Sequence, residues 1–204
     1  MLINCVNIFI DYDIILTRSD KMNLPNKLTL LRIILIPVMV VLYYIDALDT
    51  IAFMGISFKY LFIVIIFMIA SFTDFLDGYL ARKLDLVTTF GKFIDPLADK
   101  LLVMAALLLL ADAGLVWTWL VIVILSREFI VSGIRLVAVS EGKVIAASNL
   151  GKYKTASTMI AIILLFISPL YIIGHYLIIL ALALTVISGY DYLVKNLSII
   201  LKSK

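Results

Sequence analysis

The chain has 204 residues, of which 64% are hydrophobic and only 15% are charged, and its mean hydropathy is +1.17. A water-soluble domain of this length could not bury so much apolar surface, because soluble chains are typically about half apolar and about a quarter charged. The composition therefore predicts that a lipid bilayer surrounds most of the chain. The net charge of +3 is too small, and the basic residues too dispersed, to predict a nucleic-acid partner. The single cysteine, Cys5, excludes a disulfide within the chain.

The first 21 residues differ in character from the rest. They carry Asp11, Asp13 and Asp20, and they lack the basic start and apolar run of a signal peptide. Met22 opens a more ordinary N-terminal sequence. We therefore expect residues 1–21 to be a non-native or disordered extension and residues 22–204 to form one domain.

Six apolar stretches are long enough to cross a hydrocarbon core of about 30 Å, which takes roughly 20 helical residues. They run approximately over Leu28–Ile45, Tyr60–Leu80, Pro96–Ala111, Leu115–Val139, Tyr153–Ile173 and Tyr176–Leu197. Helices are expected because lipid offers no partner for an open backbone, and a barrel would show alternating segments of about ten residues. We predict an all-α integral membrane protein with six transmembrane helices. A short interfacial segment, Asn23–Thr29, is expected to precede the first of them.

The lysines and arginines predict the orientation of these helices. With the N-terminus in the cytoplasm, the basic residues outside the fourth stretch fall on the cytoplasmic side, apart from Lys59. An even number of spans places both termini on that side. We therefore expect a multi-pass protein of the cell (plasma) membrane whose active site faces the cytoplasm.

Four aspartates stand where apolar residues are expected, at the end of the second stretch and the start of the third: Asp74, Asp77, Asp95 and Asp99. Ionisable groups in a membrane are costly and are functional candidates by default. The first two are three residues apart and the last two are four apart, so each pair shares one face of its helix. Since the two helices are expected to be antiparallel neighbours, the four carboxylates would share a cleft in the cytoplasmic half of the bilayer.

Carboxylates that face one another repel unless a cation lies between them. Ligands that are all oxygen suit Mg²⁺ or Mn²⁺, and two such ions can clamp the attacking and leaving oxygens of a phosphoryl displacement. Gly78 leaves the backbone open beside Asp77, and Pro96 is expected in the first turn of its helix. Two alternatives remain. The aspartates could be a packing or topology feature, since a single aspartate pair is a weak signal, or they could relay protons, as intramembrane carboxylates do in transporters.

This part of the chain resembles the complete signature of the CDP-alcohol phosphotransferase family, and all eight defining positions match. The first half is Asp74-x-x-Asp77-Gly78-x-x-Ala81-Arg82, and after a gap of eight residues the second half is Gly91-x-x-x-Asp95-x-x-x-Asp99. The resemblance implies a six-helix membrane enzyme, usually a homodimer, with two Mg²⁺ or Mn²⁺ ions in each active site. It implies that Asp74, Asp77 and Asp95 are chiefly metal ligands. Asp99 would be the catalytic base for the acceptor hydroxyl and would also contact a metal. The resemblance further implies that the binding site for the cytidine and the diphosphate is lined by Gly78, Ala81, Arg82 and Gly91.

The fourth and fifth stretches carry basic residues that suit an anionic acceptor. Arg127 and Arg135 lie within about 80° of each other on their helix, and two guanidinium groups can grip a phosphate monoester in bidentate fashion. Lys152 and Lys154 are placed to reach the same phosphate. The alternatives are an ion pair of Arg127 with Glu128 or with the aspartates, snorkelling of Arg135 to the interface, and anchoring by the two lysines.

Three segments resemble the members of the family that use glycerol 3-phosphate as acceptor: NLPNKLTLLRI (residues 23–33), SREFIVSGIR (126–135) and GKYKT (151–155). This resemblance implies that CDP-diacylglycerol and glycerol 3-phosphate are the substrates, in a setting of membrane lipid. It also implies that Asn26, Thr29 and Arg32 contact the nucleotide, although Asn26 and Thr29 are also suited to cap a helix.

Other functions stay open at this point. Within the family, the acceptor could be serine, inositol phosphate or phosphatidylglycerol. Outside it, an intramembrane prenyltransferase also binds a diphosphate through aspartate-held Mg²⁺, but it carries two separated aspartate-rich loops and a longer bundle. A cation or proton transporter would move ions across a membrane without any nucleotide.

Overall fold

The computed structural model describes residues 24–49, 52–53, 55–83, 89–140 and 149–202. The predictions for residues 1–21 lie outside this part. The described residues form six long α-helices: α2 (Leu24–Tyr43), α3 (Phe58–Lys83), α4 (Thr89–Asp112), α5 (Thr118–Ser140), α6 (Asn149–Phe166) and α7 (Tyr171–Lys202). Two short 3₁₀ helices, η2 (Asp46–Leu48) and η3 (Ser168–Leu170), lie in the connections.

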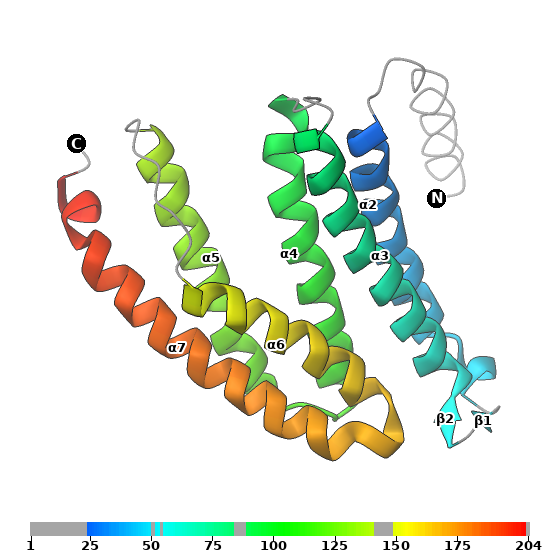
Figure 1. The fold of residues 1–204 in the computed structure, drawn as a ribbon. Coiled ribbons are helices and arrows are strands. Elements are labelled where there is room, and N and C mark those ends of the chain that lie inside the picture. Colours follow the sequence, from blue (N-terminus) through cyan, green and yellow to red (C-terminus); the bar gives the residue numbers. More distant parts are fainter. Residues whose placement is uncertain (1–23, 50–51, 54, 84–88, 141–148, 203–204) are drawn as a thin grey trace, which may run out of the picture.

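The helices run alternately up and down (Figure 1). Helix α2 packs against α3 and α4, while α7 packs against α6 and α5. The first turn of α2, the last turn of α3, the first turn of α4 and the ends of α5 and α7 all lie at one end of the molecule, the upper end in Figure 1. The ends of helices that carry the candidate site are therefore gathered at one end.

A small hairpin lies at the opposite end of the molecule (Figure 1). Strands β1 (Ala52–Phe53) and β2 (Ile56–Ser57) are antiparallel, with Ala52 opposite Ser57. Just before β1, Asp49 forms an ion pair of 2.8 Å with Lys59 in the first turn of α3. The Lys59 ammonium and the Ser57 hydroxyl lower the pKa of the Asp49 carboxyl. These contacts fix the hairpin onto α3, at the end of the molecule away from the four predicted site aspartates.

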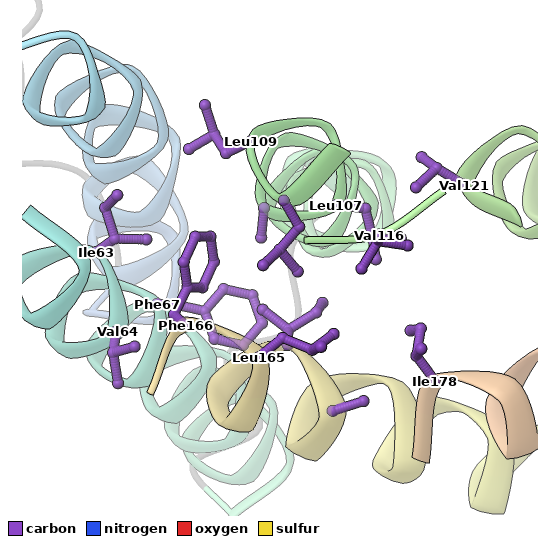
Figure 2. Packing of buried hydrophobic residues seen from close by; sticks show 14 of the residues in the cluster. Ile63, Val64, Phe67, Leu107, Leu109, Val116, Val121, Leu165, Phe166 and Ile178 are labelled. Carbon is purple, nitrogen blue, oxygen red and sulfur yellow. The ribbon is translucent and has the colours of Figure 1, made fainter. Parts of the chain in front are cut away.

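The hydrophobic core is built mainly from α3, α4 and α6, and α2, α5 and α7 add further side chains to it (Figure 2). In α3, Ile63, Phe67 and Ala70 recur at helical spacing and are buried, so this face turns inward. They share one cluster with Phe166 of α6. Large apolar side chains such as Leu136 of α5 also cover the outside, which is the surface that a helical protein presents to lipid.

Helices long and apolar enough to cross a membrane are α2, α3 and α7, over Asn26–Tyr43, Phe58–Tyr79 and Tyr171–Asn196 among the described residues. Charged residues interrupt α4 and α5 partway along, and the apolar part of α6 is shorter, Tyr153–Phe166. The chain is thus a helical membrane protein by length and composition. The count of six spans stays a prediction.

Three details of the sequence-based prediction are wrong. The fifth stretch does not continue to Ile173, because α6 ends at Phe166 and Pro169 lies in η3 before α7 begins. Leu24–Thr29 is not a separate interfacial segment, because these residues form the start of α2. Pro96 is inside its helix and not in the first turn, because α4 begins at Thr89.

The contact of α6 with α7 provides a test of the fold. A Cβ added at Gly174 would lie 2.9 Å from both Cγ and the backbone N of Leu165, whereas one added at Gly133 meets no atom within 4 Å. We expect Gly174→Ala to lower the free energy of unfolding by about 1–3 kcal/mol, because the α6 backbone must move. Gly133→Ala is the matched control and should be neutral or slightly stabilising, since alanine favours a helix. Thermal unfolding in one detergent compares the two variants, and equal midpoints would contradict this packing.

Candidate active site

Arg32 of α2 lies between two of the four aspartates. Its Nη2 donates to Asp77 Oδ2 at 2.6 Å, and its Nη1 lies 2.7 Å from Asp74 Oδ1. The second contact is an ion pair without hydrogen-bond geometry. The Nε of Arg32 also donates to the carbonyl of Ala70 at 3.3 Å. Arg32 is 0% exposed and Asp77 is 2% exposed, so a buried charge cluster joins α2 to α3.

Thr29, one helical turn before Arg32, connects the same cluster to α4. Its hydroxyl donates to Asp95 Oδ1 at 2.5 Å and lies 3.5 Å from Asp77 Oδ2. Three of the four predicted aspartates therefore gather around two side chains of α2. Asn26 lies one turn earlier on the same helix and is also buried. The prediction that Asn26, Thr29 and Arg32 contact the nucleotide stays untested, but the structure places Thr29 and Arg32 against the aspartates.

Asp99, the fourth aspartate, lies one turn after Asp95 on α4. Its Oδ1 is buried and has no hydrogen-bond partner in the described part of the chain. Asp99 and Asp74 line a cavity of about 600 Å³. An unpartnered carboxylate oxygen at a cavity wall is suited to accept a proton or to bind a cation.

The other charged residues that line this cavity are mostly basic, and we call them its basic wall. It comprises residues of α4, α5 and α6: Lys100, Arg127, Arg135 and Lys154, together with Glu128. Arg127 Nη2 donates to Ser188 Oγ of α7 at 3.0 Å, and its Nε has no partner among the described residues. Arg135 lies 5.8 Å from the ring centre of Tyr192. The structure thus brings together three of the four residues predicted to bind the acceptor phosphate.

Glu128 contacts two of these cations. Its Oε1 lies 3.3 Å from Arg127 Nη1 and forms an ion pair with Lys154 Nζ. The Arg127–Glu128 ion pair, one of the alternatives that the sequence left open, is present. The contact of Glu128 with Lys154 was not predicted. The two residues are far apart in the chain, so no local pattern could have indicated their contact.

Lys100 was also missed. It follows Asp99 directly, and its Nζ donates to Ser132 Oγ on α5. The Ser132 hydroxyl in turn donates to the carbonyl of Glu128 at 2.5 Å. The position of Lys100 next to Asp99 was a signal in the sequence, but lysines are common on the cytoplasmic side of membrane proteins, so the signal is weak.

The fit of the aspartates to metal ions can be judged from their donor atoms. Within the described residues, no three His, Cys, Asp or Glu side chains converge closely enough to hold an ion as they stand. Arg32 supplies the positive charge between Asp74 and Asp77 instead. The donor set is nevertheless all oxygen, and Asp99 Oδ1 has no partner in the part of the chain that the structure describes. The chemistry of these groups therefore fits a hard divalent cation.

The remaining predicted residues are only partly described. Gly78 is half-buried in α3, directly after Asp77. Four others lie in helices, but the positions of their side chains fall outside the described part: Ala81, Arg82, Gly91 and Lys152. Their predicted roles stay predictions.

Comparison with known proteins adds to this geometry. The family described as CDP-alcohol phosphatidyltransferase matches residues 22–187. A Bacillus subtilis protein named CDP-diacylglycerol–glycerol-3-phosphate 3-phosphatidyltransferase is 48% identical over 187 residues, which cover 85% of this chain and 95% of the relative. Relatives of the same name are 41% identical in Rickettsia prowazekii (86% and 95% covered) and 36% identical in Pseudomonas fluorescens (84% and 89% covered).

The buried charge cluster yields a stability prediction. We expect Arg32→Met to lower the free energy of unfolding by about 3 kcal/mol or more, because the buried Asp77 carboxylate would lose the opposite charge that it pairs with. Lys195→Met is the control, since its pair with Asp191 is exposed and contributes little. Chemical or thermal unfolding in detergent, without added divalent ions, measures both. An Arg32→Met protein as stable as the control would show that the cluster does not support the fold.

Proposed function

Because the chain belongs to the CDP-alcohol phosphatidyltransferase family, we propose that it transfers the phosphatidyl group of CDP-diacylglycerol to glycerol 3-phosphate. The products are phosphatidylglycerol phosphate and CMP, so the chain is a membrane enzyme of phospholipid biosynthesis. One observation carries the assignment in structural terms. A single cavity is lined both by Asp99, whose Oδ1 has no hydrogen-bond partner among the described residues, and by a group of cations.

The aspartate wall is the proposed site of CDP-diacylglycerol. Asp74, Asp77, Asp95 and Asp99 would hold two Mg²⁺ or Mn²⁺ ions, which, when bound, neutralise the diphosphate and the charge that develops on departing CMP. Arg32 lies among the same carboxylates and adds a fixed positive charge beside them. Gly78, Ala81, Arg82, Gly91, Asn26 and Thr29 are proposed to surround the nucleotide and its diphosphate.

Asp99 is the proposed base. The acceptor hydroxyl attacks the phosphorus of the phosphatidyl group, and the phosphoanhydride bond to CMP breaks. The hydroxyl proton passes to the carboxylate of Asp99, whose Oδ1 has no competing hydrogen bond among the described residues. The burial of Asp99 beside the cavity keeps this oxygen away from bulk water.

The basic wall is the proposed site of the acceptor phosphate. Arg127, Arg135 and Lys154 line the cavity from two different helices, and Arg127 retains a free Nε donor within the described part. Such a group of cations binds a phosphate monoester and contributes little to the binding of serine, which has no phosphate. Lys152 is proposed to contribute from the start of α6. This wall is the feature that favours glycerol 3-phosphate over uncharged or zwitterionic alcohols.

The placement of the enzyme in the membrane follows from the charge distribution. We infer six spans, both termini in the cytoplasm, and an active site on the cytoplasmic side of the plasma membrane. The alternating direction of α2 to α7 and the excess of lysine and arginine near the site end support this inference. A homodimer is proposed from the family alone.

A test of the activity measures CMP. Purified protein with CDP-diacylglycerol and Mg²⁺ or Mn²⁺ is expected to release CMP with glycerol 3-phosphate far faster than with serine or inositol, and a chelator should stop the release. Asp99→Asn, which removes the base and changes few atoms, should fall to background. Equal rates with all acceptors would contradict the choice of acceptor. Ion flux into liposomes without CMP release would favour a transporter.

A second prediction separates binding from structure. Arg127→Ala removes a charge-assisted partner of the acceptor phosphate, so KM for glycerol 3-phosphate should rise about tenfold or more. KM for CDP-diacylglycerol should change little, because the nucleotide is proposed to bind at the aspartates and not at Arg127. Steady-state kinetics with each substrate varied measures both constants. An Arg127→Ala protein that unfolds in detergent would instead favour a structural role for the contacts with Glu128 and Ser188.

A further inference from the structure

Glu128 is a carboxylate in the acceptor cavity that the transfer described above does not use. One of its oxygens, Oε1, contacts both Arg127 and Lys154. The side chains of these two cations are 15% and 6% exposed, and that of Glu128 is 21% exposed. Two of the cations assigned to the acceptor phosphate therefore already share a single anionic oxygen.

The position of this oxygen is the one that a phosphate oxygen would need. A carboxylate oxygen and a phosphate oxygen accept the same charge-assisted hydrogen bonds from guanidinium and ammonium groups. A phosphate monoester carries a charge of about −1.5 to −2 near pH 7, more than one carboxylate. The phosphate of the acceptor can thus replace Glu128 at both cations, whereas an uncharged alcohol cannot.

The same cations must later release a phosphate. The terminal phosphate of glycerol 3-phosphate is not consumed in the transfer, so the product still carries it. Lys154 is buried and makes no other ion pair within the described residues, so leaving it without an anion would be costly. A carboxylate that returns to the cations as the product leaves removes this cost.

The backbone at Glu128 is held in place while its side chain exchanges partners. The Ser132 hydroxyl donates to the Glu128 carbonyl and accepts from Lys100 of α4. Because Ser132 contacts the carbonyl of Glu128 and not its carboxylate, these bonds do not depend on where the carboxylate points. The side chain can therefore leave Arg127 and Lys154 and return without unfolding α5.

We propose that Glu128 is an exchangeable counter-anion, a positioning residue that holds Arg127 and Lys154 ready for the acceptor phosphate and displaces that phosphate from the product. This inference rests on the proposed function. On this proposal, Glu128 lowers the affinity for the acceptor, because it competes with the acceptor phosphate, and it raises the rate of product release. Loss of the carboxylate should therefore lower KM and kcat together, which loss of a structural brace would not do.

The test compares full-length wild type with Glu128→Gln, which keeps the shape and removes the charge. We expect KM for glycerol 3-phosphate to fall by roughly threefold to tenfold and kcat to fall as product release becomes limiting. In thermal unfolding without ligand, Glu128→Gln should melt below wild type. Glycerol 3-phosphate, and inorganic phosphate at higher concentration, should raise its midpoint by more than they raise that of wild type.

Asp191→Asn is the matched control, because it removes an exposed carboxylate paired with Lys195 on α7 and should leave all of these values unchanged. If Glu128→Gln does not fold, Glu128→Asp, which keeps the charge on a shorter side chain, should shift KM in the same direction by a smaller factor. A higher KM in either variant, with no larger stabilisation by phosphate, would overturn the proposal.

The outcomes also separate this inference from the function on which it rests. If wild type released no CMP with glycerol 3-phosphate, the proposed function would fail, while the stabilisation by inorganic phosphate would still test Glu128. If wild type is active and Glu128→Gln shows unchanged KM, kcat and phosphate stabilisation, the proposed function stands and the role of Glu128 is refuted.

Discussion

Arg32 lies between Asp74 and Asp77 at the junction of α2 and α3, with no exposed surface. Separated charges are expensive in an interior of low dielectric constant, and these groups are stable there because each lies within hydrogen-bonding distance of an opposite charge. Thr29 extends the cluster to Asp95 on α4. The pairing of α2 with both α3 and α4 depends on this cluster, so the groups of the proposed active site also determine how the first three helices pack.

The second half of the molecule follows the same constraint with the signs reversed. Here the cations outnumber the carboxylates, and Glu128 is the anion that two of them share. Arg127 reaches Ser188 on α7, and a Cβ at Gly189 would lie 2.9 Å from Arg127 Cγ, so α5 and α7 meet closely at this arginine. The cavity is thus lined by acidic side chains of α3 and α4 and by basic side chains of α4, α5 and α6.

Much of this could be predicted from the sequence, because helical periodicity and the cost of charge in lipid act locally. The spacing of Asp74 with Asp77 and of Asp95 with Asp99 indicated shared helix faces without knowledge of the fold. The partners of these groups could not be predicted, since the contacts of Arg32 with Asp77 and of Lys154 with Glu128 join residues on different helices. The end of α6 was also missed, because Ser168 and Pro169 interrupt a run whose hydropathy alone continues.

The acidic and the basic residues of the site differ in the sign of their net charge. This difference explains why one group is proposed to bind the donor and the other the acceptor. The acidic wall has four aspartates and one arginine that pairs with two of them, so an excess of negative charge remains that added cations can neutralise. Divalent ions would bring more positive charge than this excess requires, and the surplus suits an anionic diphosphate. At the basic wall the excess is positive and needs no metal, so it suits a substrate whose own phosphate supplies the missing charge. A donor activated by metal and an acceptor bound by arginine and lysine are therefore what this distribution of charge favours.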